Sequence, residues 1–340
     1  MIIDIHSHVT APLELGNFQA GLFASRAAHG RRGGLKISDE RVEDALHAPT
    51  FRGPSHLQRL KDVGTDVQLI SPRPFTLAHY AEPHSINESY VVANNDLIAQ
   101  QVRLHPDVFR GVCALPQAPG VSPSNCVEEL ERCVKELGFV GCLINPDPGE
   151  RGTDETPAMG EEFWYPLYEK MVELDVPGLI HTASCQSKRL SYSLHFINEE
   201  SIAICSLLAT PVLDDFPTLK IIVSHGGGAI PYQMGRFMAS HYNAGGARWE
   251  DKVRRLYYDT CLYTKDALEL LFKVMSTDRC MFGTENPGTG SAKDPDTGKW
   301  LDDTRPVIES IDWLTEADKR KIFEENARQV HPRLATPVAA

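Results

Sequence analysis

The chain has 340 residues, of which 42% are hydrophobic and 24% are charged, as is ordinary for a globular protein with a sizeable core. Its formal net charge of −12 argues against nucleic acids and anionic membrane surfaces as partners, because both are bound by basic faces. A small anionic substrate is compatible with this charge, since a few arginines can form a positive pocket locally.

The 8 cysteines include no CxxC pair, and no apolar run reaches the roughly 18 residues that a membrane span needs. Residues 2–8 have the pattern of a strand rather than of a signal peptide. We therefore expect reduced, mostly buried thiols in a cytoplasmic protein.

Short apolar runs recur along the chain, and most are followed by polar turn residues and a helical stretch. They are rich in Val, Ile, Leu or Phe and mostly unbroken, which is typical of buried parallel strands. The runs are Ile2–Ile5, Val67–Ile70, Val112–Leu115, Val140–Asn145, Gly178–His181, Ile221–His225, Leu256–Thr260 and Cys280–Glu285.

Helical periodicity fills the segments between these runs. A helix is expected over Ser85–His105, where Ser85 followed by Glu88 has the spacing of a capping box. A second is expected over Cys126–Leu137, ending at Gly138, a residue common at helix C-termini. Similar patterns occur over Trp164–Leu174, Glu200–Leu208 and Asp266–Met275.

Repeated alternation of strand and helix predicts a parallel sheet, and eight strands favour closure into a (β/α)8 TIM barrel. An open, doubly wound sheet is the alternative. A helix over roughly Glu316–Gln329 is expected to close the barrel. We therefore expect a single barrel domain over residues 1–332, followed by a tail over residues 333–340.

Two long connections fit neither the strand nor the helix pattern. One covers residues 10–56, and the other, over residues 146–163, is rich in Pro, Gly and acidic residues. Both follow the C-terminal end of a strand, the face where barrel enzymes place their active sites. We expect both connections to be lids or substrate-binding loops.

The first run leads into Asp4-Ile5-His6-Ser7-His8. Residues two apart in a strand point to the same side, so His6 and His8 can offer two imidazoles to one ion. Imidazole is a common metal ligand, although two histidines on an exposed strand would give the same pattern. The position of the pair at the end of an apolar strand favours a metal site.

Three further runs end in an ionisable side chain. These are His181 in the fifth run, His225 in the sixth, and Glu285 in the eighth. A lone histidine of this kind is more often a core residue, but five ionisable groups at one end of four strands are costly to bury without a cation. The glycines Gly226–Gly228 indicate either a close approach of the backbone to a ligand or a tight turn.

These groups predict a catalytic site in which one divalent ion is held by His6, His8, His181 and Glu285. The mixed nitrogen and oxygen ligands favour Zn²⁺, with Mn²⁺ next. His225 could be a further ligand, but we favour it as a base that takes a proton from water beside the ion. A non-enzymatic metal-binding barrel is the competing class. The sequence has no GxSxG, HExxH or GxxxxGK[ST] motif.

Longer motifs resemble the amidohydrolase superfamily, and within it the branch of decarboxylases, hydratases and carbon–carbon hydrolases that act on aromatic-derived acids. The resemblance covers nearly the whole chain and includes SHGGGAIPY at 224–232 and FGTE at 282–285. It is closest to the meta-cleavage-product hydrolases of bacterial lignin biphenyl catabolism, and next to the 4-oxalomesaconate hydratases. Its most specific motifs are Ile70–Phe75, Asn145–Pro148, Ser191–Glu200 and Gly235–Phe237.

The resemblance also distinguishes between reactions. Most members of the superfamily have an aspartate at the position of Glu285, whereas these hydrolases and hydratases share a glutamate that binds the metal. Glu285 therefore makes decarboxylation less favoured. The hydratases carry another glutamate in the first long loop, where this chain has His47, and this difference favours hydrolysis over hydration.

A small carboxylated product of aromatic-ring cleavage is the substrate that the resemblance implies. Arg73 is suited to bind one carboxylate and Arg236 a second, unless either forms a structural ion pair. His195, Tyr192 and Asn198 follow the fifth strand, where a loop could orient the substrate or move a proton; His195 could equally be structural.

The expected reaction is hydrolysis of a carbon–carbon bond. His225 would help to deprotonate water at the ion, hydroxide would attack a carbonyl, and the bond would break to give an acid and an enol. Hydration of a double bond is the first alternative and decarboxylation the second. We expect a homodimer, which is common in this family.

Overall fold

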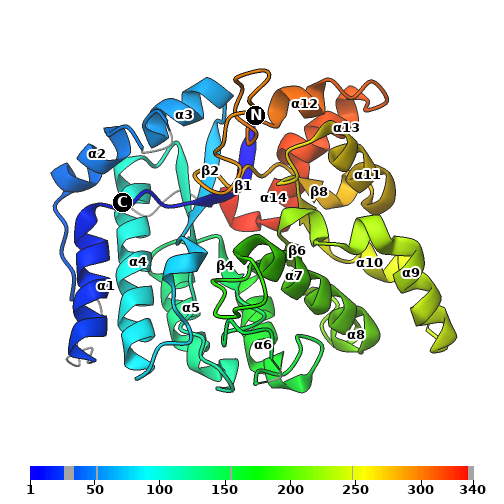
Figure 1. Ribbon diagram of the computed structural model, residues 1–340, viewed down its shortest axis with the longest axis horizontal. Coiled ribbons are helices and arrows are strands. Elements are labelled where there is room, and N and C mark those ends of the chain that lie inside the picture. The colour runs from blue at the N-terminus through cyan, green and yellow to red at the C-terminus, as the bar shows by residue number, and fades with distance from the viewer. Residues whose placement is uncertain (27–33, 51–52, 154, 247, 336–340) are drawn as a thin grey trace.

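The computed structural model describes the chain apart from residues 27–33, 51–52, 154, 247 and 336–340 (Figure 1). It contains one parallel strand at each of the apolar runs. The strands are β1 (Ile3–His8), β2 (Val67–Ser71), β3 (Phe109–Cys113), β4 (Gly141–Ile144), β5 (Gly178–Ile180), β6 (Ile221–Val223), β7 (Tyr257–Asp259) and β8 (Cys280–Met281).

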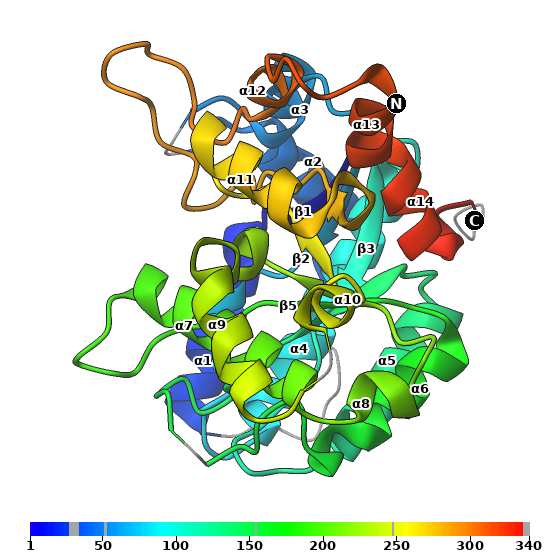
Figure 2. The ribbon, with the colours of Figure 1, turned by 90° about the vertical axis from the view of Figure 1, so that its right-hand side faces the viewer.

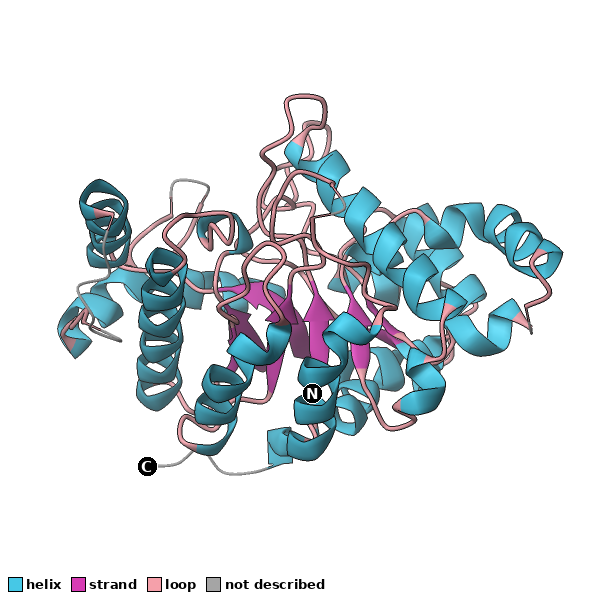
Figure 3. Ribbon diagram, turned by 90° about the horizontal axis from the view of Figure 1, so that it is seen from below, coloured by secondary structure: helices cyan, strands magenta, loops and turns pink. Residues whose placement is uncertain are grey.

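The strands pair in sequence order from β1 to β8. The two ends of the sheet meet, because the backbone N–H of Ile5 donates to the carbonyl of Phe282 (2.9 Å) and that of Glu285 donates to His6 (2.7 Å). Figure 3 shows the strands at the centre, with helices around them and loops gathered over one end. The chain therefore forms the expected TIM barrel rather than an open sheet.

Helices surround the barrel, and those expected from the periodicity are among them. They are α1 (Leu13–Ser25), α2 (Asp39–His47), α3 (His56–Val63), α4 (Ser85–Leu104), α5 (Val127–Lys135), α6 (Tyr165–Leu174), α7 (Tyr192–Ala209), α8 (Val212–Asp215), α9 (Ile230–Asn243), α10 (Trp249–Val253), α11 (Lys265–Met275), α12 (Arg305–Glu309), α13 (Glu316–Arg320) and α14 (Asn326–Val330). None of the described helices combines the length and apolar character that crossing a membrane requires.

Apolar side chains pack on both sides of the barrel wall, because successive residues of a strand face opposite sides. The outer layer joins residues such as Ile70 and Ile180 to the surrounding helices. The inner layer takes residues from every strand, among them Ile3, Leu69 and Leu179, and includes Val330 of α14. Helix α14 therefore closes one end of the barrel, as the sequence predicted.

Several details differ from the expectations. The connection over residues 10–56 contains α1 and α2, and α1 packs beside α4 (Figure 1). The expected capping box does not form. Ser85 is already the first residue of α4, so His84 and not Ser85 occupies the N-cap position. Part of the expected tail belongs to the barrel, since Leu334 is buried in the inner layer; residues 336–340 lie outside the described residues.

The longest irregular segment of the described chain was not expected from the sequence. It joins β8 to α12, over residues 282–304, and projects from the same side of the molecule as the loop before α7 (Figure 2). A buried contact holds it down, because the Arg59 guanidinium of α3 donates to the Asp302 carboxylate. This segment and the start of α7 border the candidate site.

Candidate active site

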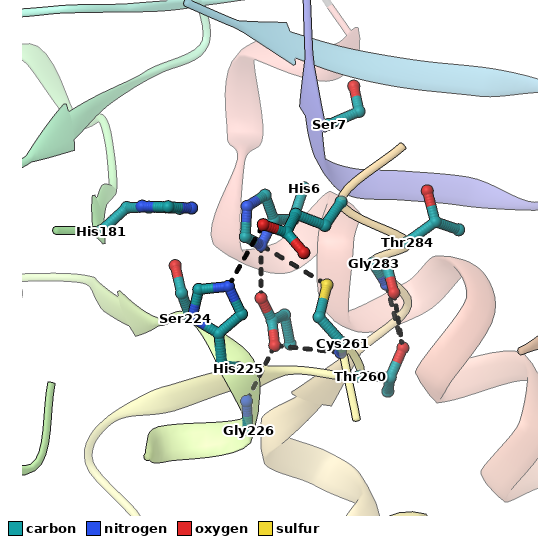
Figure 4. A network of polar contacts seen from close by, with 12 residues as sticks. His6, Ser7, His181, Ser224, His225, Gly226, Thr260, Cys261, Gly283 and Thr284 are labelled. Atoms are coloured by element: carbon teal, nitrogen blue, oxygen red, sulfur yellow. Dashed lines mark hydrogen bonds and ion pairs between the residues drawn. The ribbon is translucent and has the colours of Figure 1, made fainter. Parts of the chain in front are cut away.

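Four histidines from three strand ends converge at one end of the barrel, and Figure 4 shows three of them, His6, His181 and His225. His6 and His8 lie on β1, His181 follows β5, and His225 begins the turn after β6. The ring centroids of His6 and His181 are 4.9 Å apart, and those of His8 and His181 are 5.4 Å apart. The spacing of two along β1 therefore brings both imidazoles to one point, as predicted.

Each ligand candidate on β1 and β5 has its Nδ1 occupied. Nδ1 of His6 lies 2.5 Å from the carboxylate of Asp259, and Nδ1 of His181 donates to the backbone carbonyl of Thr182 at 2.7 Å. Nδ1 of His8 lies 3.1 Å from the Ser71 hydroxyl. Such contacts fix the tautomer that leaves the Nε2 lone pair available.

The Nε2 atoms of His6 and His181 are buried and have no hydrogen-bond partner among the described residues. Leaving two buried acceptors unsatisfied is costly, so a ligand between them is expected on physical grounds. The ligand atoms of His6, His8 and His181 lie within 4.8 Å of one another. This set of imidazoles fits a divalent metal ion.

Glu285 completes the site from the end of β8. Its carboxylate lies 3.6 Å from Nε2 of His225, and it accepts a short hydrogen bond from the Tyr263 hydroxyl. Burial would raise the pKa of Glu285, but His225 and the β1 histidines hold it below its usual range. The ligand atoms of His181, His225 and Glu285 also lie within 4.8 Å of one another.

His225 is held on its other side by Glu200 of α7, whose carboxylate lies 2.7 Å from Nδ1. Burial alone would lower the pKa of His225, but Glu200 and Glu285 raise it well above its usual value. Burial also raises the pKa of Glu200 to about 7. The His225–Glu200 pair can therefore hold a proton and release it beside the other histidines.

The three glycines after His225 serve the turn rather than a ligand. All have positive φ, between 60° and 86°. A Cβ on Gly226 would meet Leu262, one on Gly227 would meet Tyr258, and one on Gly228 would lie 2.7 Å from the Ile197 carbonyl of α7. Of the two readings of the glycines, the structure favours the tight turn, because each glycine packs against protein.

A cavity of about 240 Å³ opens beside the site. It is bordered by the segments after β2 and β8 and by the start of α7. Arg73 is in its wall, where Nε donates to the Val9 carbonyl at 3.2 Å, and Tyr192 borders it as well. Its walls are formed by His8, Thr50, Arg73, Pro74, Phe75, Tyr192, Glu285, Pro287, Gly288 and Thr289.

Three of the expected substrate-binding residues are not among those that border this cavity in the described chain. Arg236 is exposed on α9, and Asn198 is half-buried on α7. His195 is buried, with Nε2 3.5 Å from a carboxylate oxygen of Asp147. Tyr192 and His195 also lie in the first turns of a helix rather than in a loop, so α7 begins earlier than the expected Glu200.

Sequence reasoning did not single out three residues that shape the site. Asp259 ends β7, and its position as a polar residue at a strand end was a signal that could have identified it. Glu200 reaches His225 from the middle of α7, and Tyr263 reaches Glu285 from the loop after β7. Neither of these two contacts is marked by a pattern in the sequence. The expectation that a polar side chain at the end of a strand faces the site does not extend to residues in helices and loops.

Comparison with known proteins places the chain among enzymes of similar architecture. A family model described as amidohydrolase matches residues 3–333. A 2-keto-4-carboxy-3-hexenedioate hydratase from Sphingobium sp. (strain NBRC 103272 / SYK-6) is 37% identical over 346 aligned positions, covering 100% of this chain and 98% of the relative. The structure of a 4-oxalomesaconate hydratase from Rhodopseudomonas palustris has a TM-score of 0.87 and 36% identity, covering 98% and 96% of the two chains.

A more distant similarity shows the fold alone. The structure of a dihydroxybenzoic acid decarboxylase from Polaromonas sp. JS666, with bound manganese and an inhibitor, has a TM-score of 0.70 and 23% identity. The alignment covers 97% of this chain and 96% of the decarboxylase.

Proposed function

The chain belongs to the amidohydrolase family, and from this premise we propose that it is a metal-dependent hydratase. The proposed reaction adds water to a carbon–carbon double bond of a small, carboxylated product of aromatic-ring cleavage. The observation that carries the proposal is the full-length similarity to a hydratase, which extends over 100% of this chain. Two of the proteins compared in the previous subsection are more than 35% identical to this chain, and both are hydratases.

This proposal replaces the hydrolysis that the motifs favoured. That preference rested in part on His47, taken to stand where a hydratase has a glutamate. His47 is exposed on α2, and its Nδ1 lies 2.9 Å from the Glu43 carbonyl, so its side chain is directed back to its own helix. The identity of this residue is therefore a weak argument against hydration.

We assign the metal ligands to His6, His8, His181 and Glu285, with the two unpartnered Nε2 atoms as the supporting observation. A divalent ion there would supply a Lewis acid that acidifies water and polarises a substrate oxygen. The nitrogen and oxygen ligands suit Zn²⁺ or Mn²⁺. The manganese in the Polaromonas decarboxylase structure makes Mn²⁺ a natural ion to test.

The chain's own residues have distinct tasks in this proposal. His225 takes a proton at Nε2, and Glu200 stabilises the resulting imidazolium from the Nδ1 side at 2.7 Å. Arg73 binds a substrate carboxylate from the cavity wall. Tyr263 restrains Glu285 through its hydroxyl, which keeps the carboxylate beside the histidines.

The test is to incubate metal-loaded protein with unsaturated keto acids, including 2-keto-4-carboxy-3-hexenedioate and 4-oxalomesaconate, and to identify the products by mass spectrometry. Hydration gives a single product heavier by one water, with loss of the conjugated absorbance. The matched control is the His181→Ala variant under the same metal supply, in which we expect no turnover.

Other products would assign another reaction. Two smaller fragments whose masses sum to substrate plus one water would establish carbon–carbon hydrolysis. Loss of the mass of carbon dioxide would establish decarboxylation. Either result would overturn the hydratase proposal while leaving the ligand assignment intact.

A further inference from the structure

A second group of buried ionisable side chains lies between the connection after β4 and helix α7. It consists of Asp147, His195 and Glu199, which are 3%, 0% and 7% exposed. Asp147 follows β4, whereas His195 and Glu199 are four residues apart on α7 and therefore share one face of that helix. Their ligand atoms lie within 4.8 Å of one another, and the group shares no residue with the histidine site.

His195 is the unusual member of this group. Both of its ring nitrogens are buried, and neither has a hydrogen-bond partner in the part of the chain that the structure describes. Nε2 is 3.5 Å from the Asp147 carboxylate, which is longer than a good N–H···O bond. A neutral imidazole carries a lone pair on one of its two nitrogens, so His195 has one buried electron-pair donor for which no described residue supplies a hydrogen bond.

The two carboxylates add a requirement for positive charge. Within the described part of the chain, the ion pairs found for this group involve His195 alone, and no lysine or arginine neutralises Asp147 or Glu199. Burial, together with nearby Asp147, raises the pKa of Glu199 to about 7. Burying two carboxylates side by side without a cation is costly.

We propose that Asp147, His195 and Glu199 bind a second divalent cation, which joins the connection after β4 to α7. One imidazole and two carboxylates suit Mn²⁺ or Zn²⁺. The proposed role is structural, because none of the three residues borders the cavity at the histidine site. The ion would hold the start of α7, which carries Phe196, whose ring centroid is 5.1 Å from that of His181.

This inference does not depend on the reaction proposed above, and metal content tests it directly. The protein is purified, loaded with Mn²⁺ or Zn²⁺, freed of excess ion, and analysed by inductively coupled plasma mass spectrometry. We expect about two ions per wild-type chain and about one in His195→Gln and in Glu199→Gln, since each variant removes one ligand. His181→Ala should also retain about one ion, at the second site.

His331→Gln is the matched control. His331 is a buried histidine whose Nδ1 lies 3.1 Å from the Val140 carbonyl, outside both groups, so this variant should keep both ions. Circular dichroism, together with retention of the histidine-site ion, establishes that the variants at the second group remain folded.

Two results would overturn the proposal. One is a single ion per wild-type chain at saturating metal, which would mean that protons rather than a cation neutralise the group. The other is a second ion that persists in both His195→Gln and Glu199→Gln, which would place it elsewhere. Anomalous scattering from wild-type crystals at the metal edge gives an answer that needs no variant, since a peak must lie between these three side chains.

Discussion

At the scale of single residues, the orientation of His6 depends on Asp259. One carboxylate oxygen of Asp259 lies 2.5 Å from Nδ1 of His6, and the other accepts a hydrogen bond from the backbone N–H of Gly226 at 2.9 Å. Burial would raise the pKa of Asp259, but these contacts lower it to about 2, so it remains charged. One buried carboxylate thus fixes both the β1 histidine and the turn that carries His225.

Replacing Asp259 with asparagine is therefore expected to weaken metal binding. The loss should be about 10- to 100-fold, because His6 would lose the charged acceptor that favours its Nε2 lone pair. Competition with a chromogenic chelator measures the affinity. Ser71→Ala, which removes the neutral partner of His8, should have a smaller effect. Wild-type affinity in Asp259→Asn would show that the orientation of His6 is set by packing alone.

His225 tests the proposed proton transfer. In His225→Asn we expect the ion to be retained and kcat to fall by about 10²- to 10⁴-fold, the usual contribution of a general base. Glu200→Gln should lower kcat less, since the imidazole remains but loses its charged partner. Unchanged kcat in His225→Asn would exclude it as the base, and loss of the ion would identify it as a ligand.

Residues at strand ends were predictable because parallel strands in a barrel bring their C-terminal ends to one face. His6, His8, His181, His225 and Glu285 all obey that rule. Arg236 was assigned from a motif alone, and motifs do not state which face of α9 a side chain occupies. Its exposure on that helix is a consequence of packing that only the three-dimensional structure supplies.

At the scale of elements, the strands were predictable because they lie in mostly unbroken apolar runs and nearly all of their residues are buried. Helix α1 was not, because only Leu15 and Leu22 are buried along its length and Gly16 and Gly21 interrupt it. The start of α7 was missed although Ser191 caps it, accepting a hydrogen bond from the N–H of Leu194 at 3.3 Å. Its first turn is exposed, so no apolar periodicity marks it.

The turn after β6 provides a test at this scale. Gly228 has a φ of 60°, and a Cβ there would lie 2.7 Å from the carbonyl oxygen of Ile197. This oxygen belongs to the backbone, so it cannot move away as the end of a flexible side chain can. We expect Gly228→Ala to lower the free energy of unfolding by about 1–3 kcal/mol. Urea denaturation measures it.

Gly235→Ala is the matched substitution. Gly235 lies inside α9, and a Cβ there would meet no atom of the described residues within 4 Å, so alanine should raise the free energy of unfolding by about 0.5–1 kcal/mol. If Gly228→Ala and Gly235→Ala change the free energy of unfolding equally, the turn after β6 does not pack against α7 as described.

At the scale of the whole molecule, the proposed ion would connect strands from both ends of the chain. β1, β5 and β8 all contribute to the site, so a bound ion should stabilise the entire barrel against unfolding. At a free ion concentration of 100 times the dissociation constant, linkage predicts about 2.7 kcal/mol.

Metal removal tests this linkage, and Glu199→Gln isolates the histidine site from the second cation site proposed above. Chelation of that variant should lower its melting temperature by a few degrees, measured by differential scanning calorimetry. The same treatment of a Glu199→Gln, His6→Ala double variant should have little effect. If chelation leaves the melting temperature of Glu199→Gln unchanged, the ion does not bind the folded histidine site more tightly than it binds the unfolded chain.

The closure of β1 against β8 also constrains how the chain acquires its structure during synthesis. β1 is the first of the eight strands to be made, yet its hydrogen bonds to Phe282 and Glu285 need residues made about 280 positions later. Until then the nascent sheet has an unpaired edge, and contacts so distant in sequence form slowly. A ribosome-bound chain that has reached β7 holds every histidine of the site but not Glu285. The last ligand and the final seam of the barrel therefore emerge in the same stretch of translation.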